Sequence, residues 1–236
     1  MNRLLPLLVF AGLSCTRYAP KPAALNLPSP ESRSADGAML HVEAGSFRKG
    51  SSEQERERAY EDYLATHGTD TARQHQWFQY EPEIADTKIA SYRIDAHPVT
   101  QAAYAEFVAN HPSIQAPTID EGEWKAQGFI QDYKSEVARY NWSGRRPPQD
   151  RLQHPVVLVP WAKASAYCKW RGTLVGQTRR LPTADEFEAA ARGPSGSAYP
   201  WGPNFDATKL NSAVQGPRDT TAVTRFPPGR SAIGAA

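Results

Sequence analysis

The sequence predicts an irregular α+β fold in which short helices and strands are joined by much loop. Twenty prolines and sixteen glycines interrupt a chain of 236 residues at short intervals. Weak alternation of apolar and polar residues over 39–49 predicts a pair of strands. Thr183 followed by Glu186 predicts a helix that begins with a capping box, and Gly193 predicts the end of that helix. An apolar content of 40% is enough to build a core.

The first 37 residues are expected to lie outside the folded domain. Residues 1–14 carry an early arginine and then a short apolar run, which is typical of an export signal peptide. Cys15 follows a serine as in a bacterial lipoprotein cleavage box, so we expect its thiol to carry a lipid that anchors the chain to a membrane. The alternative is an ordinary secretory signal in which Cys15 is incidental. Residues 15–37 are rich in proline and serine, which predicts a disordered tether.

The folded domain is expected over residues 38–236. Residues 39–49 are predicted to form a hairpin that turns at Gly45. The charged stretch that follows predicts a helix over 53–66. Apolar residues in 84–95 then predict a further strand.

Two helices with apolar faces are predicted in the middle of the chain. Thr100 is the expected N-cap of a helix over 101–110, whose apolar residues recur at helical spacing. A second helix is predicted over 161–170, with Gly172 as its end. A buried strand is expected directly before it, over 154–161. We expect these apolar faces to supply the core.

Residues 112–151 form a long connection that carries five aromatic side chains. One interpretation is that these rings present a surface to a ligand or a partner. The other is that they pin the connection to the domain. We favour pinning, because aromatic side chains are mostly buried.

Residues 180–202, called the signature segment below, carry a resemblance to a known family. The segment begins R-L-P-T-A-D-E-F-E-A-A-A-R-G and ends Y-P-W-G. It resembles the signature of the formylglycine-generating enzyme family, also called the sulfatase-modifying factor family. Residues 154–170 and 220–234 resemble two further motifs of that family. The signature positions to which we assign a structural role are Arg180, Leu181, Pro182, Thr183, Glu186, Arg192, Gly193 and Trp201.

The resemblance implies an α+β fold related to C-type lectins, in which short helices pack on twisted antiparallel strands. In the family, a central strand and a pair of copper-binding cysteines follow the point at which this sequence ends. We therefore expect a domain that lacks its C-terminal third, and copper chemistry would need that segment to be supplied. The resemblance brings no catalytic residue to this chain. Cys168 matches a structural position, and a free thiol on an apolar helical face is normally inert.

Calcium is the metal that the resemblance suggests within the sequence. Asn211 falls where family members often place an asparagine that helps to ligate calcium, and Asp206 and Asp219 are nearby in the sequence. The other ligands come from the later segment of the family, so we expect an incomplete site. Nucleic acid is excluded as a partner class, because the lysines and arginines are scattered and form no basic run interleaved with aromatic residues.

Two functions of different classes follow. In the first, the chain is an exported lipoprotein of the bacterial cell envelope whose domain is not an enzyme and binds a protein or glycan partner. In the second, the chain is a fragment of a copper-dependent oxidase that converts a sulfatase cysteine to formylglycine. We favour the first, because no pair of redox cysteines is present in the sequence.

Overall fold

The computed structural model describes residues 38–128, 132–212, 216–217 and 219–235. The predicted signal peptide, Cys15 and the tether up to residue 37 lie outside the described residues. Within the described ranges, no helix is both long enough and apolar enough to cross a membrane.

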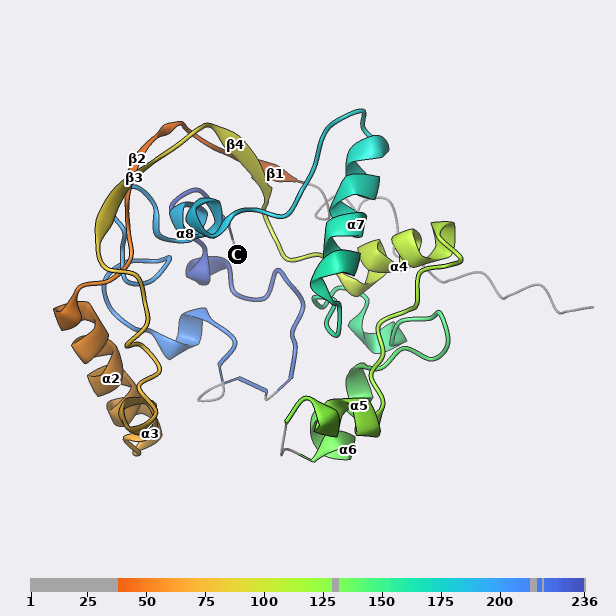
Figure 1. The fold of residues 1–236 in the computed structure, drawn as a ribbon, viewed down its shortest axis with the longest axis horizontal. Helices are drawn as coiled ribbons and strands as arrows, with labels where there is room; N and C mark the ends of the chain where they lie inside the picture. Colours follow the sequence, from red (N-terminus) through yellow and green to blue (C-terminus); the bar gives the residue numbers. More distant parts are fainter. Residues whose placement is uncertain (1–37, 129–131, 213–215, 218, 236) are drawn as a thin grey trace, which may run out of the picture.

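The strands form a twisted antiparallel ribbon (Figure 1). Its members are β1 (Met39–Val42), β2 (Gly45–Lys49), β3 (Ala85–Ile89) and β4 (Tyr92–Asp95). β1 pairs with β4 and β2 pairs with β3. Met39 lies opposite Asp95 and Gly45 lies opposite Ile89, so the two ladders keep one register across the break between them. β1 and β2 therefore act as one interrupted strand.

The predicted hairpin over 39–49 is wrong. β1 and β2 do not pair with each other, because the chain continues in the same direction through Gly45. A two-residue hairpin turn needs positive φ angles, and Gly45 is not among the residues that have one. The predicted strand over 84–95 is confirmed as β3 and β4, which are separated by a two-residue break.

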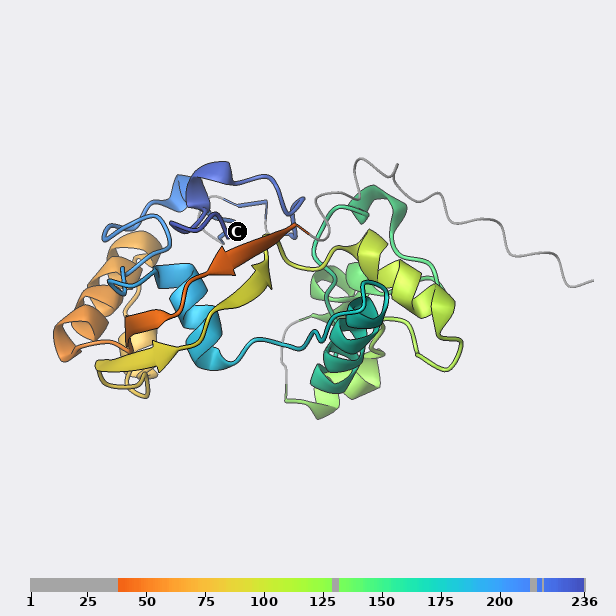
Figure 2. The same ribbon diagram turned by 90° about the horizontal axis from the view of Figure 1, so that it is seen from above.

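Helices lie on both sides of the molecule. They are α2 (Glu53–His67), α3 (Thr71–Gln74), α4 (Gln101–Asn110), α5 (Glu121–Ala126), α6 (Tyr133–Glu136), α7 (Trp161–Thr173) and α8 (Ala184–Arg192), with short 3₁₀ helices at Ala138–Tyr140, Gln149–Arg151, Ala207–Lys209 and Pro227–Gly229. α8 packs on β2 and β3, and α4 packs on α7. Figures 1 and 2 show α2, α3 and α8 beside the ribbon, with α4 to α7 on the other side of the molecule.

The main hydrophobic core lies between α4 and α7. Thr100 caps α4 as predicted, and its Oγ1 accepts the Ala103 N–H at 3.1 Å. Tyr104 is 1% exposed, and its ring stacks on that of Tyr167 at 5.5 Å. Phe107 is also 1% exposed and meets the Tyr167 ring edge-on at 5.7 Å. These rings bury much apolar surface in specific geometry, which is the main stabilising contribution on this side.

The region before α7 differs from its prediction. Residues 154–161 were expected to form a buried strand, but they are only half-buried or exposed and form no strand. Leu158 has φ 59°, a left-handed conformation that a strand does not contain and that a bulky residue rarely adopts. Within these described residues, the β pairing is limited to one isolated antiparallel bridge between Pro155 and Thr100.

Gly172 does not end α7, which continues to Thr173. It is buried, and a Cβ placed on it would lie 2.3 Å from the carbonyl oxygen of Gln177. The glycine is therefore needed for the close approach of the next segment rather than for a left-handed cap.

The connection between α4 and α7 is pinned to the domain. Trp142 is buried, and its Nε1 donates to the Gln101 side chain at 2.8 Å. Tyr133 donates its hydroxyl to the Ile119 carbonyl at 2.7 Å. The four aromatic residues of 112–151 that the structure describes are buried or half-buried, which confirms the pinning interpretation for them; Phe129 lies outside the described residues.

Candidate binding cleft

The predicted capping box at the start of α8 is present. Thr183 Oγ1 accepts the Glu186 N–H at 3.2 Å, and a Glu186 carboxylate oxygen accepts the Thr183 N–H at 2.8 Å. The two Arg180 terminal nitrogens donate to the same carboxylate at 2.6 and 2.7 Å. This bidentate pair is the main reason that the pKa of Glu186 is lowered to about 2. Arg180 thus ties the approaching chain to the first turn of the helix.

Arg192 joins α8 to the end of β2. Its guanidinium donates at 2.8 Å to each of three backbone carbonyls, those of Gly50, Ser197 and Gly196. Glu188 completes the link, since its carboxylate accepts the Gly50 N–H at 2.9 Å and also pairs with Arg192. These two side chains hold α8 and the loop that follows it to Gly50, which is distant in the sequence.

The remaining signature positions are also structural. Gly193 has φ 68° at the end of α8, a value that L side chains rarely adopt. Leu181 and Pro182 form the approach to the helix, where the Leu181 carbonyl accepts a hydrogen bond from the Arg180 guanidinium at 3.0 Å. Trp201 donates its indole N–H to the Asn204 carbonyl at 3.0 Å. These contacts of the signature segment hold the scaffold together.

The buried face of α8 differs from the one that the sequence predicts. The sequence predicts one narrow apolar face from Phe187, Ala190 and Ala191, which recur at helical spacing, but Phe187 is 63% exposed. Ala189 and Ala190 are the buried positions. Consecutive helical residues are about 100° apart, so turning Ala189 and Ala190 to the ribbon points Phe187 away from it.

A cleft of about 730 Å³ opens between α2 and residues 196–205. The residues that line it are Gly50, Ser51, Glu55, Arg58, Ala59, Asp62, Tyr63, Thr66, His67, Phe78, Glu81, Pro82, Glu188, Arg192, Gly196, Ser197, Ala198, Tyr199, Pro203 and Phe205. Its volume falls within the range of small-molecule sites, about 300–1,000 Å³. The cleft lies between the charged stretch that follows β2 and the last part of the signature segment.

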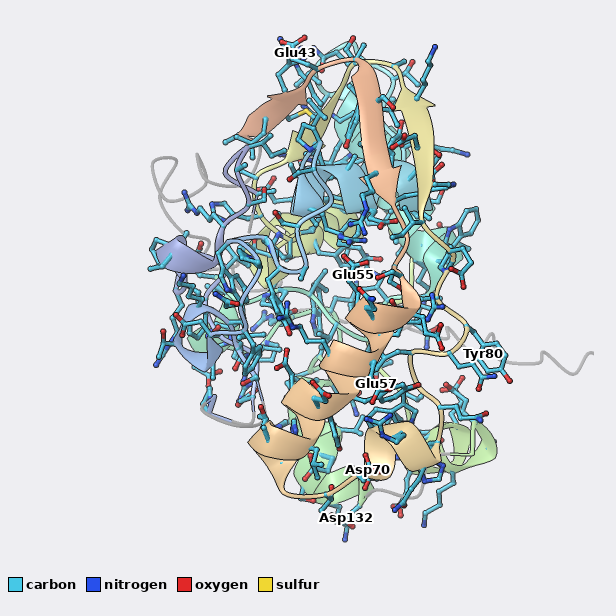
Figure 3. The ribbon with its side chains drawn as sticks, turned by 90° about the vertical axis from the view of Figure 1, so that its left-hand side faces the viewer. Glu43, Glu55, Glu57, Asp70, Tyr80 and Asp132 are labelled. Carbon is cyan, nitrogen blue, oxygen red and sulfur yellow. The ribbon has the colours of Figure 1, made fainter. Side chains whose placement is uncertain are left out.

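α2 is held in place at its start. Ser52 and Glu55 form a capping box, and the Arg48 guanidinium donates to both Glu55 carboxylate oxygens at 3.1 and 2.9 Å. Figure 3 shows Glu55 at the end of α2 that lies nearest the ribbon. The pairing with Arg48 is the main cause that lowers the pKa of Glu55 to about 2. Glu55 is therefore engaged in structure and not available to a ligand.

Aromatic rings line both sides of the cleft. On α2, the Tyr63 and His67 rings stack at 4.1 Å with 16° between their planes. Trp77 meets the Tyr63 ring edge-on at 5.4 Å and is 54% exposed. On the other side, Tyr199 stacks on Trp201 at 5.4 Å with 12° between the planes. Tyr199 and Phe205, whose ring centroids are 5.7 Å apart, line this wall of the cleft, and Trp201 supports Tyr199 without lining the cleft.

Three charged side chains, those of Arg58, Asp62 and Glu81, line the cleft together with these rings. Tyr199 donates its hydroxyl to Asp62 at 3.1 Å. Burial, and then the negative charge of Asp62, raise the pKa of Tyr199 to about 12. Arg58 is exposed and near enough to oppose that rise, yet in the described part of the chain its side chain has no hydrogen bond or ion pair. Glu81 accepts a hydrogen bond from Ser51 Oγ at 2.6 Å.

The cleft was not predicted from the sequence. Arg58 and Asp62 are four residues apart and share one face of a helix, but this spacing is common on solvated helices. The sequence offered no sign that the signature segment would lie opposite them.

Cys168 lies on α7 against the aromatic core. Burial, and then the nearby Asp95 carboxylate, raise the pKa of its thiol. The chain's other cysteine, Cys15, lies outside the described residues. Copper(I) favours soft thiolate ligands, and a single protonated thiol beside a core does not fit that requirement.

The side chains around Asn211 are engaged with other partners. Asn211 donates its amide N–H to the Asp219 backbone carbonyl at 2.7 Å. The Asp219 carboxylate pairs with Arg151, which is the main cause that lowers the pKa of Asp219 to about 2. Asp206 accepts the Thr208 N–H at 2.9 Å and caps a 3₁₀ helix. Among the described residues, no three His, Cys, Asp or Glu side chains are placed to hold a metal ion. The calcium site at Asn211 stays a prediction.

Comparison with protein families gives a match over residues 24–234 to the "Sulfatase-modifying factor enzyme 1-like domain". Among curated relatives, the "Inactive C-alpha-formylglycine-generating enzyme 2" of Bos taurus is 30% identical over 177 residues, which cover 63% of this chain and 57% of that protein. The "Formylglycine-generating enzyme" of Mycobacterium tuberculosis is 28% identical over 156 residues, which cover 54% of this chain and 50% of that protein. The chain thus spans about half the length of these relatives.

Among solved structures, PvdO from Pseudomonas aeruginosa has a similar fold. The TM-score is 0.55 at 19% identity, and the match covers 84% of this chain and 65% of that one. This similarity supports the loop-rich α+β fold and says nothing about activity, because one fold can hold many functions.

Proposed function

Because this chain belongs to the sulfatase-modifying factor enzyme 1-like family, we propose that it is a member without oxidase activity, which binds a ligand at the bacterial cell envelope. In this proposal the cleft beside α2 is the binding site. A lipid on Cys15 holds the domain at the membrane, and residues 15–37 give it reach from the surface.

The observation that carries the proposal is that Cys168 has no second cysteine beside it among the described residues. It is the one cysteine of the described residues, and it packs against the core with a raised thiol pKa. An oxidase that uses copper needs thiolates that can approach the metal together. The signature residues offer no substitute, because their polar groups are used in holding α8 to the ribbon. Binding in a cleft needs none of that chemistry.

A copper-supplemented assay tests the absence of oxidase activity. The full chain is incubated with copper and a peptide that carries the sulfatase cysteine motif, and the peptide is examined by mass spectrometry for conversion of cysteine to formylglycine. We expect no conversion, whereas the Mycobacterium tuberculosis relative serves as the positive control. Turnover by this chain alone would overturn the proposal.

The lipid anchor is tested by metabolic labelling with a clickable fatty acid. We expect label on the wild-type protein and on Cys168→Ala, and no label on Cys15→Ala. Cys168→Ala is the matched control, because it removes the other thiol and leaves the proposed lipid site intact. An unlabelled wild-type protein, or label that survives Cys15→Ala, would contradict the anchor.

The alternative is that the chain is part of a copper-dependent oxidase. It is favoured by the similarity to the Mycobacterium tuberculosis protein, which is named as an enzyme. The DNA that follows the coding sequence decides between the two. A reading frame that supplies two closely spaced cysteines would favour the oxidase, and one without them would favour the binding protein.

A further inference from the structure

The cleft combines flat aromatic faces with polar groups at their edges. The stacked Tyr63 and His67 rings lie on α2 and line the cleft, whereas Trp77 meets the Tyr63 ring edge-on from outside the lining. Tyr199 lies on the other wall and is held by Trp201. Such faces attract flat groups with C–H bonds directed at the ring, because the ring face carries negative charge density.

The carboxylates that line the cleft outnumber its arginines by four to two. Two of its carboxylates, Glu55 and Glu188, are paired with arginines and are not available. The groups that remain are Asp62 and Glu81, beside Arg58. A strongly anionic ligand would face two carboxylates against the one guanidinium of Arg58, which disfavours it. A neutral ligand avoids this repulsion.

The same polar groups offer both donors and acceptors. Arg58 can only donate hydrogen bonds, whereas ionised Asp62 and Glu81 can only accept them. A hydroxyl group both donates and accepts, so a ligand rich in hydroxyls can satisfy all three side chains. A sugar ring has a flat C–H face and a rim of hydroxyls, which matches the aromatic walls and the polar edge together.

From this arrangement we propose that the cleft binds a short neutral oligosaccharide, with a sugar ring stacked on Tyr63 and its hydroxyls bonded to Arg58 and Asp62. The inference rests on the proposed binding function and narrows its ligand to one chemical class. The cleft volume of about 730 Å³ accommodates a ligand of more than one ring.

Isothermal titration calorimetry on the full chain tests this inference. The probes are maltotriose, cellotriose and triacetylchitotriose, with trigalacturonic acid as an anionic sugar and one acidic and one basic hexapeptide. We expect saturable binding of at least one neutral trisaccharide, and weaker binding of the anionic sugar and both peptides. No saturable heat with any neutral trisaccharide, or preference for a peptide, would overturn the inference.

Two variants locate the binding. Tyr63→Ala removes the stacking face and should weaken the affinity about tenfold or more. Arg58→Gln removes a donor from an exposed side chain without a protein partner in the described residues, and should weaken the affinity about threefold to tenfold while leaving the fold intact. Unchanged affinity in a folded Arg58→Gln together with a folded Tyr63→Ala would place the sugar elsewhere and overturn the inference.

Tyr80→Ala is the matched control. Tyr80 is 83% exposed and does not line the cleft, and Figure 3 shows it projecting from the loop after α3. We expect its affinity to stay within about twofold of the wild type. The sugar test is separable from the oxidase assay, since absence of sugar binding leaves an inactive domain inactive, and turnover would overturn the proposed function whether or not sugars bind.

Discussion

The α4–α7 side of the molecule and the α2–α8 side are stabilised in different ways. Between α4 and α7, the buried rings of Tyr104, Phe107 and Tyr167 pack on one another. Between α2, α8 and the ribbon, buried apolar side chains such as Phe47 and Ala190 are joined by ion pairs and charge-assisted hydrogen bonds, such as those of Arg48 and Arg192. The first side depends on removal of apolar surface from water, and the second adds charge and hydrogen-bond geometry to a smaller apolar contribution.

The difference has a consequence for function. The rings of Tyr104, Phe107 and Tyr167 are buried in the core on the α4–α7 side, whereas Tyr63 and Trp77 on the α2 side leave part of their surface open. A region that is held partly by polar contacts can leave apolar faces uncovered without losing its structure. The cleft lies in that region.

The largest effect that we expect comes from Phe107→Ala. Phe107 is 1% exposed and touches several rings, so its truncation removes burial and leaves a cavity. The free energy of unfolding should fall by about 3–5 kcal/mol. Urea denaturation followed by circular dichroism measures the change. A loss below about 1 kcal/mol would contradict the assignment of Phe107 to the core.

Arg192→Ala should have the next largest effect. It removes the arginine donor from the Gly50 and Ser197 carbonyls, leaves the Gly196 carbonyl only a 3.4 Å hydrogen bond from Arg48, and leaves Glu188 without its charge partner. We expect a loss of about 2 kcal/mol, measured by the same denaturation. Arg93→Ala is the control, because Arg93 is exposed and has no side-chain partner in the part of the chain that the structure describes. Equal effects of the two substitutions would count against the role of Arg192.

Acid should weaken the α2–α8 side. The folded pKa values of Glu55 and Glu186 are about 2, against ordinary values of 4.5. A depressed pKa contributes stability above the unfolded value, and that stability is lost as the pH falls from 4.5 through about 2. We expect a loss of about 1–2 kcal/mol, less than the full shifts imply because Arg180 is exposed to solvent.

Hydrogen exchange measured by mass spectrometry separates the two sides in this acid experiment. Peptides from α2 and α8 should lose protection as the pH falls from 4.5 to about 2, and those from α4 should lose less. Exchange rates must first be corrected for the intrinsic effect of pH. Uniform loss across both sides would show that the carboxylates do not distinguish them.

Phe187→Ala should have the smallest effect. Phe187 is 63% exposed, so its truncation removes little buried surface. We expect a change within about 0.5 kcal/mol, measured beside Phe107→Ala so that the same substitution is compared on α8 and α4. A loss as large as that of Phe107→Ala would mean that Phe187 is covered in solution.

Local interactions were predicted well from the sequence. Thr100 and Thr183 begin their helices as expected, since a cap needs only a side chain and a backbone N–H a few residues away. The helix of the charged stretch was also predicted almost to its ends. Such contacts close within one turn, and their partners can be read from neighbouring positions.

Non-local choices were predicted less well. The prediction of a hairpin over 39–49 was wrong because β2 pairs with β3, some forty residues later. The prediction of a strand over 154–161 was wrong because Leu158 adopts a left-handed conformation, which no local sequence pattern indicates. Long-range pairing depends on the whole set of competing contacts, and alternation alone does not rank them.

The sequence by itself determined the family, the capped helices and the loop-rich α+β character, because these are recorded in short runs of residues. The tertiary structure decided which face of α8 is buried, what Arg192 holds, and where the cleft lies. Those features bring Gly50 and α2 against residues 196–205, which lie far from both along the chain. Their proximity comes from packing, which no local pattern encodes.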